Sequence, residues 1–216
     1  LHCSSAASDV YKRQILLENN SLPKDYLKKR GINKDTIIEF QIGYVPYNSD
    51  FYTELSKKYS EKEISDTGLF YKNEKYKKNI NRFYSRIIFP IRNITGDVIA
   101  FGGRIIEDKK IAKYINSPET EFYKKGKHVF NLDKARSANN KANEVVIVEG
   151  YMDVISIYST GIKNVVSNSG IALTGSQINL IWKFFSNPII CLDGDVSGQK
   201  AALRLALIHI YEPTRP

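Results

Sequence analysis

Residues Pro188–Ala206 read "PIICLDGDVSGQKAALRLA", in which an apolar run leads into two aspartates and then into a glycine-punctuated segment. The apolar run predicts a buried strand, and the residues from Gly198 onward predict a helix. Asp193 and Asp195 are two positions apart, so their side chains share a face if the chain stays extended there. The stretch therefore places two carboxylates together at the end of a strand.

The same alternation of strand and helix precedes this stretch. Strands are predicted at "EVVIVEG" (144–150) and "NVVSNSG" (164–170), and helices at "YMDVISIYSTG" (151–161) and "SQINLIWKFF" (176–185). Alternating elements of this kind are typical of an α/β unit with a parallel sheet, whose right-handed crossovers bring the loops after the strands to one edge. Ligands bind at that carboxyl edge.

Three carboxylates are expected to converge there. Glu149 ends the first strand of the unit, and Asp193 and Asp195 follow the third. Their mutual repulsion is relieved if a cation lies between them, and carboxylate oxygens are the ligands that Mg²⁺ accepts. Asp153, four residues after Glu149 on the following helix, is a candidate for a supporting contact. An isolated Asp-Gly-Asp is more often a surface turn, but the matching Glu149 favours a metal site.

The chain before this unit lacks the regular alternation of strands and helices. Residues 21–46 predict two short helices, the first starting near Pro23 and stopping at Gly31, and the second capped by Asn33. "RIIFPIRN" (86–93) and "DVIAFGGRII" (97–106) predict a hairpin that projects three arginines from a β scaffold, namely Arg86, Arg92 and Arg104. Residues 131–143 predict a helix and a polar linker. We expect a mixed α/β basic subdomain over residues 15–142 and a Rossmann-like parallel sheet over 143–206.

Positive charge is concentrated in residues 71–92, which lead into the hairpin and form its first strand. The 216-residue chain has a net charge of +9. Residues 71–92 carry a single acid, Glu74, against seven basic residues with aromatic residues between them: Lys72, Lys75, Lys77, Lys78, Arg82, Arg86 and Arg92. This combination suits a groove that follows nucleic-acid phosphates and stacks bases, and a solvated lysine-rich face is an equally open interpretation.

The composition argues against a membrane protein and against a disulfide-rich protein. Hydrophobic residues make up 42% of the chain, and no apolar run is long enough to span a membrane, so we expect a cytoplasmic globular protein. The cysteines are Cys3 and Cys191, which excludes a disulfide framework or a cysteine zinc site. Residues 1–14 and 207–216 show no periodicity continuous with their neighbours and resemble translated sequencing-adapter read-through, so we expect them to be non-native.

Three motifs of the second unit, in this order and spacing, resemble the Toprim fold of bacterial DNA primases: "VEGYMDV" (148–154), "SGIALTGSQ" (169–177) and "CLDGDVSGQKAA" (191–202). "RFYSRIIFPIRN", "FGGRII" and "KYINSPET" resemble the subdomain that precedes Toprim in the same family. The resemblance runs from about residue 15 to 206. It implies a nucleotidyltransferase, a DNA-directed RNA polymerase that makes short RNA primers from ribonucleoside triphosphates on a single-stranded DNA template.

The resemblance also implies roles for individual residues. Glu149 matches the acid of the first Toprim motif, Asp193 and Asp195 match the catalytic pair that binds Mg²⁺ or Mn²⁺, and Asp153 matches a further acidic position. Seven residues are expected to bind nucleotide or template: Arg82, Arg86, Arg104, Lys113, Tyr114, Asn116 and Lys125. Tyr84 stands where other members often carry an arginine, and Ile171 where threonine is common.

The family also contains parts that this sequence does not. The resemblance implies an amino-terminal zinc-binding domain, for which this sequence has no cysteine and histidine cluster, so we do not expect zinc in these residues. It also implies a carboxyl-terminal region that binds the replicative helicase, which we expect to lie outside this sequence. A last acidic motif is expected on a strand beyond Ala206, so we expect a fragment with an incomplete metal site. The alternatives are a Toprim nuclease or topoisomerase-related enzyme, and a non-catalytic fragment that binds single-stranded DNA.

Overall fold

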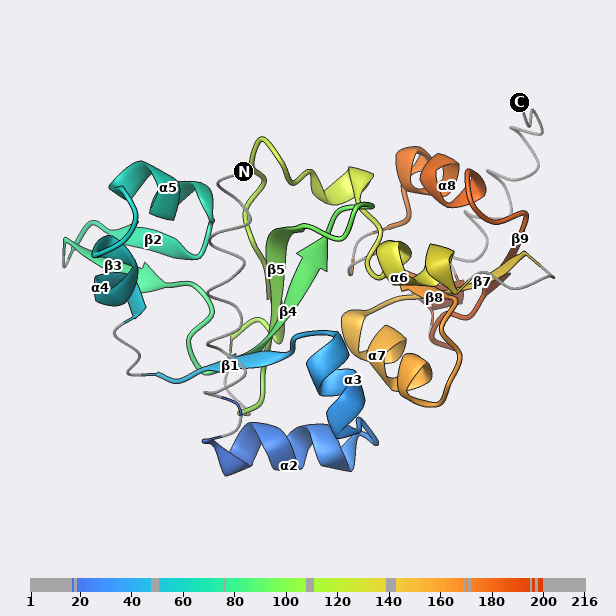
Figure 1. The fold of residues 1–216 in the computed structure, drawn as a ribbon, viewed down its shortest axis with the longest axis horizontal. Helices are drawn as coiled ribbons and strands as arrows, with labels where there is room; N and C mark the ends of the chain where they lie inside the picture. Colours follow the sequence, from blue (N-terminus) through green and yellow to red (C-terminus); the bar gives the residue numbers. More distant parts are fainter. Residues whose placement is uncertain are drawn as a thin grey trace. The chain divides into compact units, whose positions relative to one another are not determined.

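A computed structural model describes residues 17, 19–47, 51–75, 77–107, 111–138, 143–168, 170, 172–194, 196 and 198–199. Contacts divide the chain into two units, Leu1–Tyr123 and Lys124–Pro216, which are described separately below (Figure 1). The expected terminal segments, 1–14 and 207–216, lie outside the described residues. The subdomain boundary expected near residue 142 stays a prediction.

A four-stranded antiparallel sheet forms the centre of the first unit (Figure 1). Its order is β1 (Gly43–Val45), β4 (Arg86–Arg92), β5 (Val98–Ile105) and β6 (Tyr114–Asn116). The hairpin expected from the sequence is confirmed, since β4 pairs with β5 from Arg86↔Ile105 to Arg92↔Val98. Gly96 in the connecting turn has a φ of +94°, a conformation that glycine adopts without steric cost.

Two helices precede this sheet, as the sequence predicts. They are α2 (Ser21–Lys29) and α3 (Lys34–Glu39). Asn33 caps α3, because its Oδ1 accepts a hydrogen bond of 2.8 Å from the backbone amide of Thr36. Gly31, with a φ of +72°, lies between the two helices.

The basic stretch after residue 70 forms strands that the sequence did not predict. β2 (Phe70–Asn73) and β3 (Lys78–Asn81) pair as an antiparallel hairpin. α4 (Phe51–Ser56) and α5 (Glu61–Asp66) lie near it, and their apolar side chains join residues of the larger sheet in one buried cluster. That cluster contains Val45, Phe51, Leu55, Ile64, Leu69, Phe83, Ile88, Val98 and Phe101.

The second unit contains the predicted parallel sheet. Its order is β8 (Val165–Ser167), β7 (Glu144–Val148) and β9 (Asn187–Ile190), with both neighbours parallel to β7. The crossovers contain α7 (Tyr151–Ser159) and α8 (Gly175–Trp182), which Figure 1 shows on either side of the strands. Before β7 lie a short 3₁₀ turn, η1 (Lys125–Lys127), and α6 (Leu132–Ser137).

One expectation about this sheet is wrong. The sequence predicts a buried strand at residues 188–191, but Ile189 and Ile190 of β9 are 47% and 44% exposed. β9 lies at the edge of the sheet and pairs only with β7 among the described residues. The helix expected over residues 198–206 lies largely outside the described part of the chain. No helix within the described ranges is long and apolar enough to cross a lipid bilayer.

Candidate functional site

The carboxyl edge of the parallel sheet brings two predicted acidic residues together. β7 and β9 are neighbours in register, with Ile147 opposite Ile190, so the residues that follow the two strands emerge side by side. The backbone amide of Asp193 donates a hydrogen bond of 3.1 Å to Oε1 of Glu149. Glu149 is half-buried and Asp193 is exposed. Asp195, the other residue of the predicted pair, lies outside the described residues.

The backbone at Gly198 lies close to both Asp193 and Glu149. A Cβ atom added at Gly198 would lie 2.0 Å from the backbone oxygen of Asp193 and 3.0 Å from Oε1 of Glu149. No side chain fits there without moving the loop. Gly198 was not among the predicted site residues, although a glycine five residues after the strand-end aspartate can indicate close backbone packing.

Asp153 contacts the start of its own helix. Its Oδ2 accepts a hydrogen bond of 3.0 Å from the backbone amide of Gly150, the residue before α7. A carboxylate at this position stabilises a helix because it faces the unpaired amides of the first turn. The structure thus gives Asp153 a capping contact, and its role as a metal ligand stays a prediction.

The two strand-end carboxylates fit part of a divalent metal site. Carboxylate oxygens are the donors that Mg²⁺ and Mn²⁺ prefer. The second oxygen of Glu149 and the carboxylate of Asp193 have no protein partner among the described residues. Within those residues no group of three or more histidine, cysteine, aspartate or glutamate side chains could hold a metal. Glu149 and Asp193 therefore supply oxygen ligands but not a complete coordination shell.

The hairpin arginines of the first unit are held by protein groups. Arg86 is 4% exposed, and its guanidinium donates hydrogen bonds of 2.8 Å to the carbonyl of Ala112 and 3.1 Å to that of Lys113. Burial lowers the pKa of the Arg86 guanidinium, and the Tyr84 side chain partly opposes this. Arg92 donates to the carbonyl of Gly96 at 2.6 Å and to the side chain of Gln41.

Arg104 is enclosed by aromatic rings. Only 6% of it is exposed, and its guanidinium lies 5.1 Å from the ring centroid of Tyr26 and 4.8 Å from that of Tyr114. It also donates a hydrogen bond to the Tyr114 hydroxyl. The expectation that the hairpin projects its arginines is therefore wrong for Arg86 and Arg104, because backbone carbonyls and rings distant in sequence surround them. Their assigned binding roles stay predictions.

Other predicted binding residues of the first unit lie at its surface. Lys113 is exposed, and Tyr114 on β6 is 38% exposed. Asn116 is partly exposed and lies opposite Gly102 of β5. Arg82 is half-buried, with its Nε donating to the carbonyl of Gly68 at 3.3 Å and its guanidinium 5.7 Å from the ring centroid of Tyr71.

The β2–β3 hairpin carries four further lysines, all exposed: Lys72, Lys75, Lys77 and Lys78. An aromatic pair lies at the start of β4, where the centroids of the Tyr47 and Tyr84 rings are 5.8 Å apart in an edge-to-face arrangement. Tyr47 is 72% exposed. Exposed rings can stack bases and exposed cations can contact phosphates, which are the contacts that single-stranded nucleic acid requires.

Lys125, the remaining predicted residue, belongs to the second unit. It begins η1 and is half-buried. Its carbonyl accepts a hydrogen bond of 3.2 Å from Nε2 of Gln177, a residue that the sequence analysis did not single out. Nothing in the local sequence indicates this contact, which joins segments 52 positions apart.

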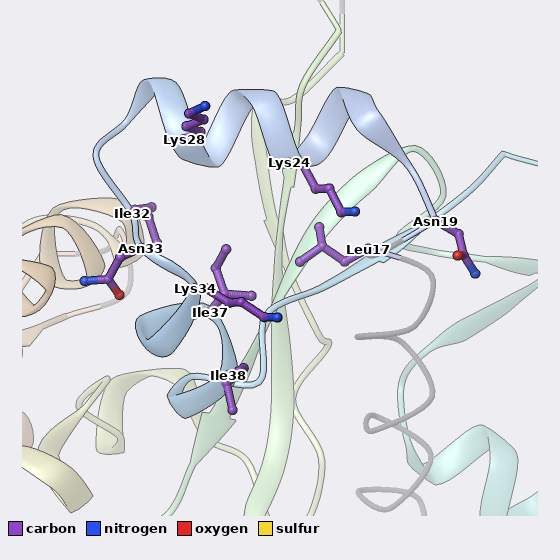
Figure 2. Close-up of a pocket in the computed structure, with 9 residues that line it drawn as sticks. All are labelled: Leu17, Asn19, Lys24, Lys28, Ile32, Asn33, Lys34, Ile37 and Ile38. Atoms are coloured by element: carbon purple, nitrogen blue, oxygen red, sulfur yellow. The ribbon is translucent and has the colours of Figure 1, made fainter.

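A separate cavity lies between α2 and α3 (Figure 2). It has a volume of about 660 Å³, and apolar side chains and lysines line it. The lining residues are Leu17, Asn19, Lys24, Lys28, Ile32, Asn33, Lys34, Ile37 and Ile38. None of the predicted site residues is among them, so we assign this cavity no part in the site.

Comparison with known proteins finds matches over both units. Residues 10–136 match the family described as DNA primase catalytic core, N-terminal domain, and residues 143–212 match the Toprim domain. The DNA primase of Halalkalibacterium halodurans is 40% identical over 203 residues, which are 93% of this chain and 34% of that protein. The chain thus spans about a third of the length of the curated relatives it matches.

Solved structures give the same result. The zinc-binding and RNA polymerase domains of the Aquifex aeolicus primase align with a TM-score of 0.86 at 33% identity, over 93% of this chain and 50% of that one. A DnaG primase catalytic domain bound to single-stranded DNA aligns with a TM-score of 0.84 at 32% identity, over 94% of this chain and 67% of that one.

Proposed function

This chain belongs to the DNA primase family, and we propose that it forms part of a catalytic core that synthesises short RNA primers on single-stranded DNA. The observation that carries the proposal is the pairing of Glu149 with Asp193 at adjacent strand ends, where the Asp193 amide meets Oε1 of Glu149 at 3.1 Å. These residues lie in the segment that matches the Toprim domain.

The reaction would be nucleotidyl transfer. A ribose 3′-oxygen forms a bond to the α-phosphorus of a ribonucleoside triphosphate, the bond between that phosphorus and the α–β bridging oxygen breaks, and pyrophosphate leaves with the electron pair. The hydroxyl proton passes to solvent. A divalent ion such as Mg²⁺ or Mn²⁺, when bound, would lower the pKa of the attacking hydroxyl and neutralise phosphate charge. Glu149 and Asp193, with Asp195, would hold this ion, and no side-chain nucleophile is required.

The basic side chains would hold the template and the triphosphate. Lys113 is exposed and Arg82 and Lys125 are half-buried, and their cations would contact phosphates regardless of base sequence. Tyr114, next to Lys113 in the chain, offers a partly exposed ring. Arg86 and Arg104 are buried; besides the nucleotide or template contacts predicted for them, they would hold Lys113 and Tyr114 in place.

The wider assignments rest on family membership. We propose that the protein works in the cytoplasm and meets the replicative helicase through a region outside these 216 residues. We also propose a boundary between the two subdomains near residue 142, since the two family matches end and begin at residues 136 and 143.

Primer synthesis tests the proposal. Labelled ribonucleotides, single-stranded template and Mg²⁺ or Mn²⁺ are incubated with this chain and with a version extended through the next strand of the natural protein. We expect short RNA from the extended version and none from its Asp193→Asn variant. DNA nicking or relaxation in the same reactions would favour the nuclease or topoisomerase alternative. Template binding without synthesis by either version would leave only the non-catalytic alternative.

A further inference from the structure

The first turn of α8 contains a fully buried amide. Gln177 has 0% of its surface exposed. The Oε1 of Gln177 accepts a hydrogen bond of 3.0 Å from the backbone amide of Thr174, and the Thr174 hydroxyl accepts one of 3.2 Å from the backbone amide of Gln177. These reciprocal bonds form a capping box. The box uses one end of the Gln177 side chain and leaves its NH₂ group for other acceptors.

That NH₂ group bonds to a segment about 50 positions earlier in the chain. Nε2 of Gln177 donates to the carbonyl of Lys125 at 3.2 Å and to that of His128 at 2.7 Å. The Thr174 hydroxyl donates to the carbonyl of Gly126 at 2.6 Å. The helix cap thus binds three carbonyls of the turn that contains η1.

Close packing accompanies these bonds. A Cβ atom added at Gly126 would lie 3.4 Å from Cγ2 of Thr174, so little space separates the turn from the cap. Loss of a buried donor leaves carbonyls without partners and costs more than the net value of the bonds themselves. The hydrogen bonds from Thr174 and Gln177 therefore hold the backbone of this turn against the cap of α8.

We propose that Gln177 is a positioning residue, which holds η1 so that Lys125 and Lys127 present their ammonium groups to phosphates of the bound nucleic acid. This inference rests on the proposed function, in which Lys125 contacts template or nucleotide. Lys125 is half-buried and Lys127 is exposed. A turn fixed in advance spares the binding reaction the entropy of ordering two long side chains on a mobile backbone.

Two substitutions of Gln177 separate its positioning of η1 from its capping of α8. Gln177→Glu keeps the acceptor for the Thr174 amide, and glutamate is a good capping-box residue, but it lacks the two donors to η1. Gln177→Met lacks the donors without adding charge. Ile181→Val is the control, because Ile181 is 1% exposed in the same helix and the change loosens packing without touching these bonds.

The experiment measures the affinity for a dT oligomer and the rate of trypsin cleavage after Lys124, Lys125 and Lys127. We expect both Gln177 variants to weaken binding about fivefold and to speed cleavage about tenfold, as local opening of the turn becomes easier. Ile181→Val should change neither. In a background with Lys125→Gln and Lys127→Gln, Gln177→Met should weaken binding no further, because the positioned charges are gone.

The results distinguish two failures. Unchanged affinity in Gln177→Met, or an equal loss in the neutralised background, would overturn the positioning role alone. Unchanged affinity in the Lys125→Gln, Lys127→Gln variant would instead overturn the proposed binding role of the turn, and the positioning role with it. The trypsin rates do not depend on nucleic acid, so they show in either case whether Gln177 holds η1.

Discussion

The backbone amide of Asp193 donates a hydrogen bond of 3.1 Å to Oε1 of Glu149, and this bond connects the loop after β9 to the end of β7. The bond orients Glu149 without neutralising it, and neither residue forms an ion pair with a described residue. Two negative charges held at one edge repel each other, and a cation or the loss of one charge relieves the repulsion.

Removing the charge of Asp193 should keep the fold and abolish metal binding. In Asp193→Asn the backbone amide that contacts Glu149 is unchanged, so we expect the melting temperature to stay equal or to rise slightly. Mg²⁺ or Mn²⁺ at ten times its Kd stabilises a protein by about 1.4 kcal/mol through mass action. We expect a shift of a few degrees in the unaltered chain and none in the variant, measured by thermal denaturation.

The control for this prediction is Asp25→Asn, an exposed aspartate of α2. It should respond to metal as the unaltered chain does. An Asp193→Asn variant that metal stabilises as strongly as the control would place the metal elsewhere. The Asp193→Asn, Asp195→Asn double variant should behave like the single one, with no primer synthesis.

A substitution at Gly198 tests the pairing of Glu149 with Asp193 by a steric change instead of a change of charge. In Gly198→Ala the new Cβ would lie 2.0 Å from the backbone oxygen of Asp193, so the loop must move and the pairing with Glu149 is disturbed. We expect a loss of about 1–3 kcal/mol in the free energy of unfolding and no stabilisation by metal. Gly194→Ala is a matched control, since nothing lies within 4 Å of its added Cβ. Equal effects of the two changes would contradict the close approach.

The sequence predicted the second unit better than the first, for a physical reason. Strands such as Val145–Val148 and the helices between them carry their own periodic apolar pattern, so local residues decide the fold. β2 and β3 are polar and lysine-rich, and their pairing depends on cross-strand partners and on packing of Phe70 against α4. The burial of Arg86 depends on carbonyls 26 and 27 residues away, which no local pattern shows.

Binding of single-stranded DNA should depend on salt and on three cations. We expect affinity for a dT oligomer to fall steeply as salt rises, because phosphate contacts release counterions. Replacing Arg82, Lys113 and Lys125 with glutamine should flatten the slope of log affinity against log salt by about 2. Fluorescence anisotropy over a salt series measures this.

A charge-matched control comes from the cavity of Figure 2, where Lys24, Lys28 and Lys34 are replaced with glutamine. This variant has the same net charge as the other but alters none of the predicted binding residues. We expect a smaller change of slope. Equal slopes for the two triple variants would show that binding follows net charge and not a defined surface.

The turn of the β4–β5 hairpin should respond to acid. Hydrogen bonds from Thr95 (2.6 Å) and Asn93 (3.0 Å) to Oδ2 of Asp97 lower the pKa of that carboxyl. A carboxyl group whose pKa is lowered in the folded state stabilises the fold at pH values above its unfolded pKa of about 3.9. That contribution is lost as pH falls through the folded pKa, so the window lies below about pH 4.

We expect the Asp97 carboxyl to titrate below a model aspartate in an NMR titration, and Asp97→Asn to make amide exchange in the hairpin less dependent on pH there. A titration midpoint of Asp97 at or above that of a model aspartate would contradict the hydrogen-bonded turn.

Tyr84 tests whether an aromatic pair replaces a phosphate contact. Its ring packs edge-to-face on Tyr47 at the start of β4. Tyr84→Arg would place a guanidinium beside the exposed Tyr47 ring, and we expect tighter binding of a dT oligomer at low salt. One added phosphate contact should steepen the salt slope by about 0.7. Tyr84→Phe keeps the ring and should change neither quantity. If Tyr84→Arg instead weakens binding at every salt concentration with an unchanged slope, the ring stacks a base, an interaction worth about 1–3 kcal/mol.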